Sequence, residues 1–470
     1  MAGIVSYGAY IPFHRLSRRT IAEAFGEPGG KGEKAVANHD EDSISMAVAA
    51  ALDALTGLSA ERLAAVYLAT TTAPYAEKQS ATTVAAALNC REALRTADFT
   101  DSLRAGTTAL LNGLETVQVQ RAPVLVAAAD CRLGGVQGSF EKELGDAAAA
   151  FVLGEEDVIA QLVAAHSVAA DLIDQWRSAG ERTVRAWEER FALQEGYFPQ
   201  VKAAVSGVLA KSGVRPDQLA KVVLYAPNAR THAAAVKMMG LQPEQVQEPL
   251  FDRVGNAGAA SVPLMLAAAL EEARPGDRIL VVAQGQGCDA LLFEVTEAIT
   301  ALPPRRGVKG HLASKKAIAN YTTYLKWKNL LPMEAGRRPQ RRRPSVPAMW
   351  RNHQQNLAFV GSRCTACGTP QFPKQRVCVH CKTKDQMEDY PFADKTARIA
   401  TYTVDYLTIS PDPPTVFAVV DFDGGGRIIC EMTDVDPSQL DIGMEVEMTF
   451  RRLYEAEGLH NYAWKARMKR

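Results

Sequence analysis

Four of the eight cysteines lie in two closely spaced pairs near the C-terminal end, a spacing typical of a metal site. Cys364 and Cys367 form the first C-x-x-C pair, and Cys378 and Cys381 form the second after ten intervening residues. Together the pairs supply four thiolates, a ligand set that tetrahedral zinc prefers. Four protein ligands close the coordination shell, so we expect a structural zinc ion. His380 lies inside the second pair and is not needed as a ligand.

The other cysteines stand singly among apolar residues, at Cys90, Cys131, Cys288 and Cys430. This is not a disulfide framework, and it favours a reducing compartment. The N-terminal segment has no basic stretch before its apolar part, and no apolar run approaches the roughly 20 residues of a membrane span. We therefore expect a cytoplasmic protein with no membrane partner. The 53 basic and 53 acidic side chains cancel, which argues against a nucleic-acid partner.

The first 300 residues contain an internal repeat, which indicates two similar α/β halves. Three segments of the first half recur in the same order in the second, at a nearly constant offset. The matching segments are 54–70 and 208–226, 103–111 and 255–264, and 122–131 and 277–288. The predicted strands within them are continuously apolar, as expected for a sheet that is covered on both faces.

The chain changes character after residue 300. We expect a basic linker with a helix over 301–350, a zinc ribbon over 351–390 and a small β-barrel over 391–470. The barrel is indicated by five short alternating strand patterns separated by Gly and Pro turns. The linker carries five arginines between Arg337 and Arg343. They are typical of a solvated linker, although they could also reach an anionic ligand such as a nucleotide phosphate.

The duplicated α/β region resembles the thiolase superfamily, and within it the HMG-CoA synthase-like branch. The resemblance covers nearly all of residues 1–300. It is carried by the segments GIVSYGAYIPFHRL, EKAVANHDEDSISMAVAAALDAL, TAPYAEKQSATTVAAAL, GDAAAAFVLG, YAPNARTHAAAVKMMGL and GQGCDALLF. It implies a five-layered αβαβα core, a homodimer formed through this domain, and an acyl-CoA substrate.

The C-terminal region, from GSRCTACGTPQFPKQRVC onward, resembles a second family. This family combines a rubredoxin-like zinc ribbon with an OB-fold and is associated with acyl-CoA enzymes. The resemblance implies that the C-terminal module covers the acyl-CoA site or binds coenzyme A.

The catalytic positions depart from the family pattern. The family's nucleophilic cysteine precedes a Lys-Ala-Gly-Thr-like helix start, and DSLRAGT puts Leu103 there. The family's catalytic histidine lies two residues before a Pro-Asn pair, where this chain has Tyr225. The family's general-base glutamate lies three residues before a Pro-Tyr pair, where this chain has Thr71. Leucine cannot form a thioester, so the covalent chemistry of the family is not available at this position.

One family feature is retained in the second half. Asn256 lies in the small-residue motif GNAGAAS, and in the family this asparagine helps to bind the thioester carbonyl oxygen. A site that stabilises an oxyanion but lacks a nucleophile can still support enolate chemistry, given one acid/base group. Tyr225 could be that group if its pKa were lowered from about 10. Some cysteine-less thiolase-like proteins are aldolases that work with a zinc-ribbon/OB-fold partner.

We therefore predict retro-aldol cleavage or aldol formation on a β-hydroxyacyl-CoA, with Tyr225 as the acid/base group. Because of their places in the family motifs, Tyr75, Asn228, His232 and Gly287 are expected to bind substrate. One alternative is an HMG-CoA synthase-like acyltransferase with a displaced nucleophile. Ser102 and Cys288 are the candidates for it, although their types and places also suit a helix cap and a buried loop residue. Another alternative is a non-catalytic acyl-CoA-binding scaffold for a partner thiolase.

Overall fold

The computed structural model describes residues 2–334 and 342–470, which divide into two compact units. The first unit comprises Met1–Ala37, Asp42–Thr82 and Arg91–Tyr321. The second comprises Asn38–Glu41, Thr83–Cys90 and Thr322–Arg470. Among the described residues, no helix is both long and apolar enough to cross a bilayer.

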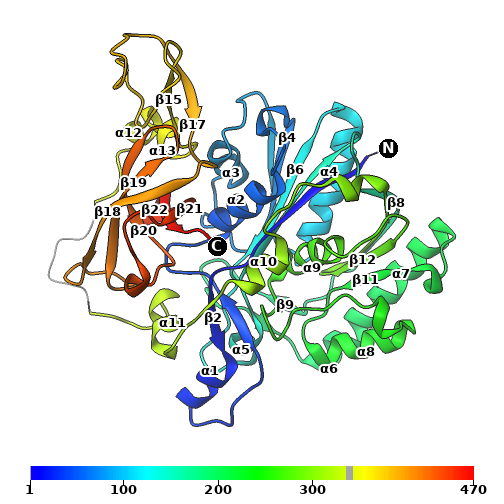
Figure 1. Cartoon of the computed structure of the whole chain (residues 1–470). Coiled ribbons are helices and arrows are strands. Elements are labelled where there is room, and N and C mark those ends of the chain that lie inside the picture. Colours follow the sequence, from blue (N-terminus) through cyan, green and yellow to red (C-terminus); the bar gives the residue numbers. More distant parts are fainter. Residues whose placement is uncertain (1, 335–341) are drawn as a thin grey trace. The chain divides into compact units, whose positions relative to one another are not determined.

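A nine-stranded sheet forms the centre of the first unit (Figure 1). Its strand order is β11-β12-β13-β8-β1-β7-β6-β4-β5. The strands are β1 (Gly3–Tyr10), β4 (Ala65–Ala69), β5 (Arg95–Phe99), β6 (Val124–Asp130), β7 (Ala147–Gly154), β8 (Ala160–Ala169), β11 (Lys221–Leu224), β12 (Arg278–Gln284) and β13 (Gly287–Val295). The two halves of the sheet join where β1 pairs with β8 through Gly3 with Gln161 and Ile4 with Ala160.

The strand order confirms the predicted duplication. In the first half β1 and β7 are antiparallel, β7 and β6 are antiparallel, and β6 and β4 are parallel. The second half repeats these three relations: β8 and β13 are antiparallel, β13 and β12 are antiparallel, and β12 and β11 are parallel. The repeated segments 54–70 and 208–226 contain the equivalent strands β4 and β11, and the segments 122–131 and 277–288 contain the equivalent strands β6 and β12. The first half adds β5, parallel to β4, at its outer edge.

Helices on both faces of the two half-sheets complete the αβαβα arrangement. Helix α4 (Ala105–Gln120) packs on β4 and β6, and helix α9 (Ser261–Leu270) contacts α4 and strands of both halves. Helix α2 (Ser43–Ala54) covers the other face of β1 and β7, and α7 (Phe198–Ser212) covers β8 and β13. The central helices approach closely: a Cβ atom at Gly106 on α4 would lie 2.7 Å from the Cγ atom of Pro263 on α9 and 2.6 Å from the carbonyl oxygen of Ala259 just before it. This contact explains the small residues in both repeated motifs.

The remaining elements of the first unit are short. A three-stranded sheet consists of β2 (His14–Ser17), β3 (Glu33–Val36) and β14 (Lys316–Ala317). A two-stranded sheet consists of β9 (Gln175–Trp176) and β10 (Arg185–Ala186). The helices are α1 (Arg18–Ala24), α5 (Ser139–Glu143), α6 (Glu189–Phe191), α8 (Ala229–Met239) and α10 (Gly307–Ala313). Of these, β9 and the chain around it matter most, because they form part of the wall of a cavity.

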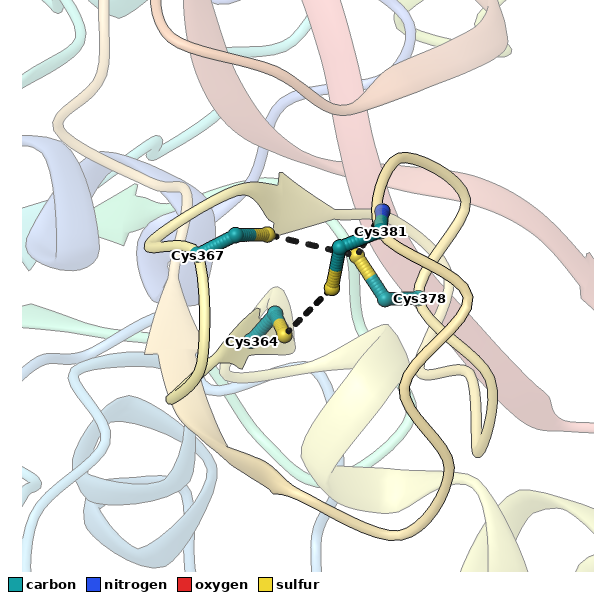
Figure 2. A group of neighbouring side chains, drawn as sticks. All are labelled: Cys364, Cys367, Cys378 and Cys381. Atoms are coloured by element: carbon teal, nitrogen blue, oxygen red, sulfur yellow. Dashed lines mark hydrogen bonds between the residues drawn. The ribbon is translucent and has the colours of Figure 1, made fainter.

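The second unit contains the predicted ribbon and barrel. The ribbon has the strand order β16-β15-β17, and its two cysteine turns face each other (Figure 2). The barrel is closed, with the order β18-β19-β20-β22-β21. The strands are β15 (Val360–Cys364), β16 (Pro370–Gln371), β17 (Met387–Pro391), β18 (Ala397–Asp405), β19 (Thr415–Phe422), β20 (Arg427–Met432), β21 (Glu445–Ala456) and β22 (Leu459–Met468). The helices that lie wholly or mostly in this unit are α3 (Ala81–Ala87), α11 (Tyr321–Trp327), α12 (Val346–Arg351) and α13 (His353–Asn356).

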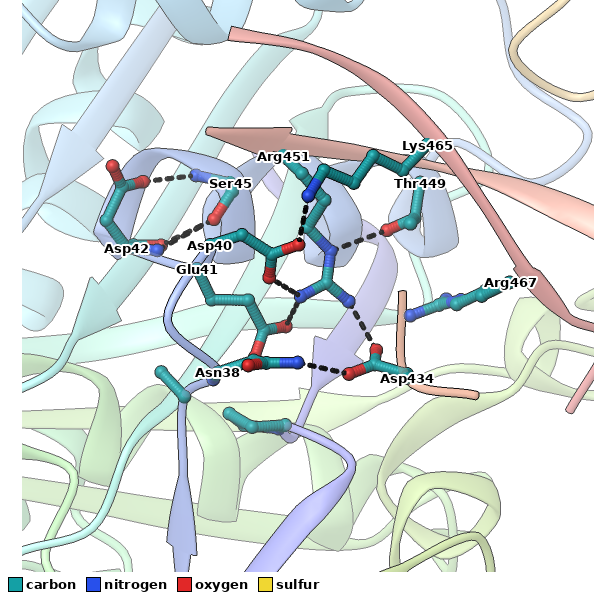
Figure 3. Close-up of polar contacts among 12 residues, drawn as sticks. Asn38, Asp40, Glu41, Asp42, Ser45, Asp434, Thr449, Arg451, Lys465 and Arg467 are labelled. Atoms are coloured by element: carbon teal, nitrogen blue, oxygen red, sulfur yellow. Dashed lines mark hydrogen bonds and ion pairs between the residues drawn. The ribbon is translucent and has the colours of Figure 1, made fainter. Parts of the chain in front are cut away.

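A buried charge cluster holds the segment Asn38–Glu41 within the second unit (Figure 3). Arg451 on β21 forms ion pairs with Asp40 at 3.2 Å, Glu41 at 2.6 Å and Asp434 at 2.6 Å. Lys465 on β22 reaches Asp40 at 3.0 Å and also contacts Glu431. The side chains of Arg451, Lys465 and Asp40 are each only 1% exposed. The barrel therefore binds a segment that lies about 400 residues earlier in the sequence.

Candidate functional site

The four predicted zinc ligands come together at one end of the ribbon. Their sulfur atoms all lie within 4.8 Å of one another. The Sγ atoms of Cys364 and Cys381 are 3.6 Å apart, and those of Cys367 and Cys378 are 3.5 Å apart (Figure 2). This spacing fits four thiolates around one tetrahedral zinc ion. The set is complete without His380, so the ion would stabilise the ribbon and would not bind substrate.

A cavity of about 860 Å³ lies in the first unit, next to the carboxyl ends of parallel strands β4 and β6. Thr71 follows β4, and Arg132 follows β6, so the sheet brings both residues to the same edge. Ser102 and Leu103 reach the cavity just before α4 begins. The cavity is lined by Thr71, Asp101, Ser102, Leu103, Arg132, Asp171, Leu172, Ile173, Gln175, Trp176, Arg177, Val184, Trp187, Phe191 and Gln286. Carboxyl edges of this kind are the usual ligand sites of α/β sheets.

Leu103, at the position of the family's nucleophile, presents an apolar side chain to the cavity. The adjacent Ser102 also lines the cavity, but its hydroxyl donates a hydrogen bond of 2.9 Å to the carbonyl oxygen of Gly285. The Ser102 hydroxyl also accepts a hydrogen bond from the backbone N–H of Arg104. The chain at Gly285 is so close that a Cβ atom there would lie 3.0 Å from the backbone nitrogen of Leu103. Ser102 therefore joins the segment before α4 to this loop.

Thr71 lines the cavity and is held by Asp130, a fully buried residue at the end of β6. The Thr71 backbone N–H and hydroxyl donate to the two carboxylate oxygens of Asp130, at 2.7 and 2.9 Å. Asp130 also accepts from the hydroxyls of Thr70 and Thr72 and from the backbone N–H of Ala259. With all these donors, Asp130 fixes the loop after β4 to the segment that leads into α9.

Tyr225 and Asn256 form a buried pair. The Asn256 Nδ2 group donates to the Tyr225 hydroxyl and to the carbonyl oxygen of Pro227, both at 3.2 Å. The Asn256 Oδ1 atom accepts from the backbone N–H of Gly258 and from the Ser261 hydroxyl. Both amide hydrogens of Asn256 are therefore in use, whereas the Tyr225 hydroxyl donates to no acceptor among the described residues. The phenolic proton is the one that this pair can offer to a ligand.

The ionisation of Tyr225 differs from our expectation. Burial raises the pKa of Tyr225 above its ordinary value of 10. The charge of Arg132 and the hydrogen bond from Asn256 act in the opposite direction but do not reverse the shift. The pKa of Tyr225 is therefore not lowered, as a tyrosine base at neutral pH would need. At neutral pH the phenol is protonated, and Tyr225 is suited to donate a proton.

The structure joins only some of the predicted catalytic positions in one place. Thr71 and Leu103 line the cavity, whereas the buried Tyr225 and Asn256 are not among its lining residues. Arg132 connects the two groups, because it lines the cavity and its charge acts on Tyr225.

The four expected substrate-binding residues lie outside the lining of the cavity. Asn228 caps α8, accepting from the Thr231 backbone N–H at 2.9 Å, and borders a smaller hollow of about 370 Å³. His232 is buried on α8, where burial lowers its pKa. The Tyr75 ring is 5.4 Å from the Lys78 ammonium. Gly287 has a φ of +116°, and a Cβ atom there would lie 2.0 Å from the Val168 carbonyl oxygen. Contact of these four residues with substrate stays a prediction.

Three of the single cysteines, Cys90, Cys288 and Cys430, are poor nucleophiles. Burial raises the pKa of Cys288 well above its ordinary value, and it raises the pKa of Cys90 to about 12. Burial likewise raises the pKa of Cys430 to about 12. Of the linker arginines, Arg337, Arg338 and Arg341 lie outside the described residues. Arg343 forms a 3.7 Å ion pair with Glu457.

Sequence reasoning missed Asp130, Arg132 and the aromatic wall of the cavity. Asp130 and Arg132 come directly after a run of apolar residues, and charged residues at the end of a buried strand could have indicated a functional site. The wall includes Trp176 and Trp187, two of only five tryptophans, within one polar stretch without helix or strand periodicity.

Comparisons with known proteins agree with this architecture. The model of the 3-oxoacyl-[acyl-carrier-protein] synthase III C-terminal family matches residues 209–294. The ChsH2 rubredoxin-like zinc ribbon model matches residues 356–388, and the ChsH2 C-terminal OB-fold model matches residues 390–451.

Relatives similar to the first part of the chain are hydroxymethylglutaryl-CoA synthases. The protein of Picrophilus torridus is 33% identical over 346 residues, which are 70% of this chain and 98% of the relative. That of Caldivirga maquilingensis is 31% identical over 347 residues, 71% of this chain and 99% of the relative. The solved structure of MvaS in complex with 3-hydroxy-3-methylglutaryl coenzyme A has the same fold, with a TM-score of 0.62 and 20% identity over 73% of this chain and 94% of that one. The chain therefore belongs to the hydroxymethylglutaryl-CoA synthase family of thiolase-like enzymes, and it continues into a ChsH2-type zinc ribbon and OB-fold.

Proposed function

We propose that the protein forms or cleaves a carbon–carbon bond in an acyl-CoA thioester by an aldol-type step, without a covalent acyl-enzyme. The observation that carries this proposal is the buried Tyr225–Asn256 hydrogen bond, taken together with Leu103 at the nucleophile position of the cavity. Arg132 connects the two, because it lines the cavity and its charge acts on Tyr225. Family membership supports the acyl-CoA thioester as substrate, since the relatives are named as synthases of a CoA ester. We further propose that the protein works in the cytoplasm as a homodimer formed through its first unit.

Tyr225 has a defined role in this proposal. When an enolate of one acyl-CoA adds to an aldehyde or ketone, the carbonyl oxygen of the acceptor becomes an alkoxide. The Tyr225 phenol gives its proton to this oxygen, and the product is a β-hydroxyacyl-CoA. The proton that left the α carbon when the enolate formed restores the Tyr225 phenol through solvent, so the turnover consumes and releases no net proton. Asn256 holds the Tyr225 hydroxyl in place through the hydrogen bond that it donates. The raised pKa keeps Tyr225 in the protonated form from which this direction starts, whereas cleavage starts from the deprotonated phenol.

A product screen tests the proposal. Purified full-length protein would be given β-hydroxyacyl-CoAs in one series, and acyl-CoAs with aldehydes or ketones in another, with products followed by mass spectrometry. We expect β-hydroxyacyl-CoA in the second series, or an aldehyde or ketone with a shorter acyl-CoA in the first. Binding of acyl-CoA without any product in either series would favour the non-catalytic scaffold instead.

The second candidate function is acyl transfer through a displaced nucleophile. It is favoured by the position of Ser102, which lines the cavity beside Leu103. Against it, the Ser102 hydroxyl is committed to the Gly285 carbonyl oxygen, and no histidine or carboxylate hydrogen-bonds to it among the described residues. A Ser102→Ala variant separates the two functions. Under our proposal it retains product formation to within about tenfold, whereas a displaced serine nucleophile predicts a loss of about 10⁴-fold or more.

A further inference from the structure

We infer that Arg132 binds a carboxylate on the acyl group of the substrate, so that the preferred substrates are carboxylated acyl-CoAs. This inference rests on the proposed function for the acyl-CoA itself, and it adds the chemical class of the acyl group. Arg132 is 6% exposed and lines the 860 Å³ cavity. Its Nη2 atom donates to the Gln175 side-chain oxygen at 2.9 Å. Its Nη1 atom is buried and has no hydrogen-bond partner among the described residues.

Arg132 is a buried cation with one open hydrogen-bond donor, its Nη1 atom. A guanidinium group stays charged in proteins, and burying a charge without a partner is costly. In the part of the chain that the structure describes, no carboxylate forms an ion pair with Arg132 within 4.0 Å. A carboxylate supplied by the ligand would satisfy both the charge and the open Nη1 donor through charge-assisted hydrogen bonds.

Asp130, two residues before Arg132, and Asp174, next to Gln175, already accept several hydrogen bonds. Asp130 accepts five hydrogen bonds, from Thr70, Thr71, Thr72 and Ala259. Asp174 accepts from the backbone N–H of Gln175 and from the side chains of Gln284 and Gln286. Asp101 and Asp171 also line the cavity, as does Arg177, and Asp101 accepts a hydrogen bond from the Thr100 hydroxyl.

The Arg132 side chain is fixed in position before a ligand binds. Its aliphatic part packs against the backbone at Gly258, where a Cβ atom would lie 2.6 Å from the Arg132 Cδ atom. Gln175, on β9, fixes the other end of the side chain. Little conformational entropy remains to be lost when an anion binds.

The rest of the cavity suits a hydrocarbon chain that carries such a carboxylate. Its apolar lining residues are Leu103, Leu172, Ile173, Trp176, Val184, Trp187 and Phe191. These side chains can bury methylene groups, while Arg132 recognises the anionic group.

Binding measurements test the inference without any turnover. Isothermal titration calorimetry on the full-length protein would compare succinyl-, glutaryl- and adipyl-CoA with butanoyl-, pentanoyl- and hexanoyl-CoA, paired by the number of acyl carbons. We expect at least one carboxylated ligand to bind about tenfold or more tightly than its neutral partner. Arg132→Gln should abolish this preference, and Arg132→Lys should retain part of it. Arg177→Gln, which removes the other arginine of the same cavity, should leave the ratio unchanged.

Three results would overturn the inference: no preference in any pair, a preference that survives Arg132→Gln, or a preference lost only in Arg177→Gln. If Arg132→Gln fails to fold, as judged by its melting curve, the wild-type protein would be compared with the methyl esters of the carboxylated acyl-CoAs. Equal binding of acid and ester would then reject the carboxylate. An Arg132-dependent preference for neutral 3-hydroxyacyl-CoAs would assign Arg132 to a β-oxygen instead. Because these are binding data, a carboxylate preference without any aldol product would refute the proposed function and leave this inference standing.

Discussion

At the scale of single residues, Tyr225 and Arg132 acquire their properties from burial. The sequence predicted which side chains replace the family's catalytic groups, because fixed motifs mark those positions. It did not predict the raised pKa of Tyr225 or the open donor of Arg132. Both depend on neighbours distant in sequence, such as Asn256 for Tyr225 and the Gly258 backbone for Arg132.

Replacing Tyr225 with phenylalanine tests its role as proton donor. Phenylalanine keeps the ring packing and removes only the hydroxyl that Asn256 holds. We expect product formation to fall by about 10²-fold or more, since general acid catalysis contributes at least this much. Product would be quantified by mass spectrometry, with the melting temperature as a check on folding.

The control for this variant is Tyr402→Phe, which removes a hydroxyl that donates to the Leu440 carbonyl oxygen in the barrel. It should leave the rate of product formation unchanged. If Tyr225→Phe and Tyr402→Phe had equal rates, Tyr225 would not be the proton donor.

At the scale of elements, the barrel strands β21 and β22 present buried cations to the segment Asn38–Glu41. This contact could not be predicted from the sequence, because it joins residues about 400 positions apart and each charged residue alone is typical of a surface position. The ribbon, by contrast, was predictable in full, because its chemistry lies within 18 consecutive residues.

The buried charge cluster predicts an acid-sensitive second unit. Burial alone would raise the pKa of Asp40, but Lys465 and Arg451 together hold it well below its ordinary value. The stabilisation is therefore complete above the unfolded-state pKa of about 3.9 and is lost as the pH falls below it. Hydrogen exchange of the β21 and β22 amides should speed up as the pH is lowered through 4, after correction for intrinsic exchange rates.

Asp40→Asn tests the same cluster at neutral pH. It leaves Arg451 and Lys465 with one counter-charge fewer, and we expect the unfolding free energy of the second unit to fall by about 3–5 kcal/mol. The matched control is Arg427→Gln, which breaks an exposed pair with Asp421 and should cost at most about 1 kcal/mol. Equal effects of the two variants would contradict a structural role for the cluster.

Zinc removal tests the ribbon. We expect about one zinc ion per chain by elemental analysis, because the four cysteines form one site. A Cys378→Ser variant should lose the metal and the exchange protection of β15 and β17, since metal binding and folding are coupled in such sites. A zinc-free wild-type protein with an intact ribbon would contradict this prediction.

At the scale of the whole molecule, the order of the domains was predictable from the internal repeat and from the two motif-bearing regions. The cavity was not, because residues 171–191, which supply much of its wall, follow no helix or strand period. Tertiary contacts decide where such a segment lies, so its tryptophans could not be placed from the sequence.

The proposed homodimer makes a prediction at this scale. Light scattering coupled to size-exclusion chromatography should give about twice the chain mass of 50.8 kDa. The family resemblance of the first unit is the reason for this expectation. A mass equal to that of one chain at micromolar concentration would contradict it.

We propose that this member of the family works without a covalent acyl-enzyme. The most direct measurement is the intact mass of the protein in samples quenched during turnover, with product measured in the same samples. We expect product to accumulate while the protein keeps its unmodified mass. A mass increase equal to the acyl group, appearing and disappearing with turnover and located in the peptide that contains Ser102, would contradict the account.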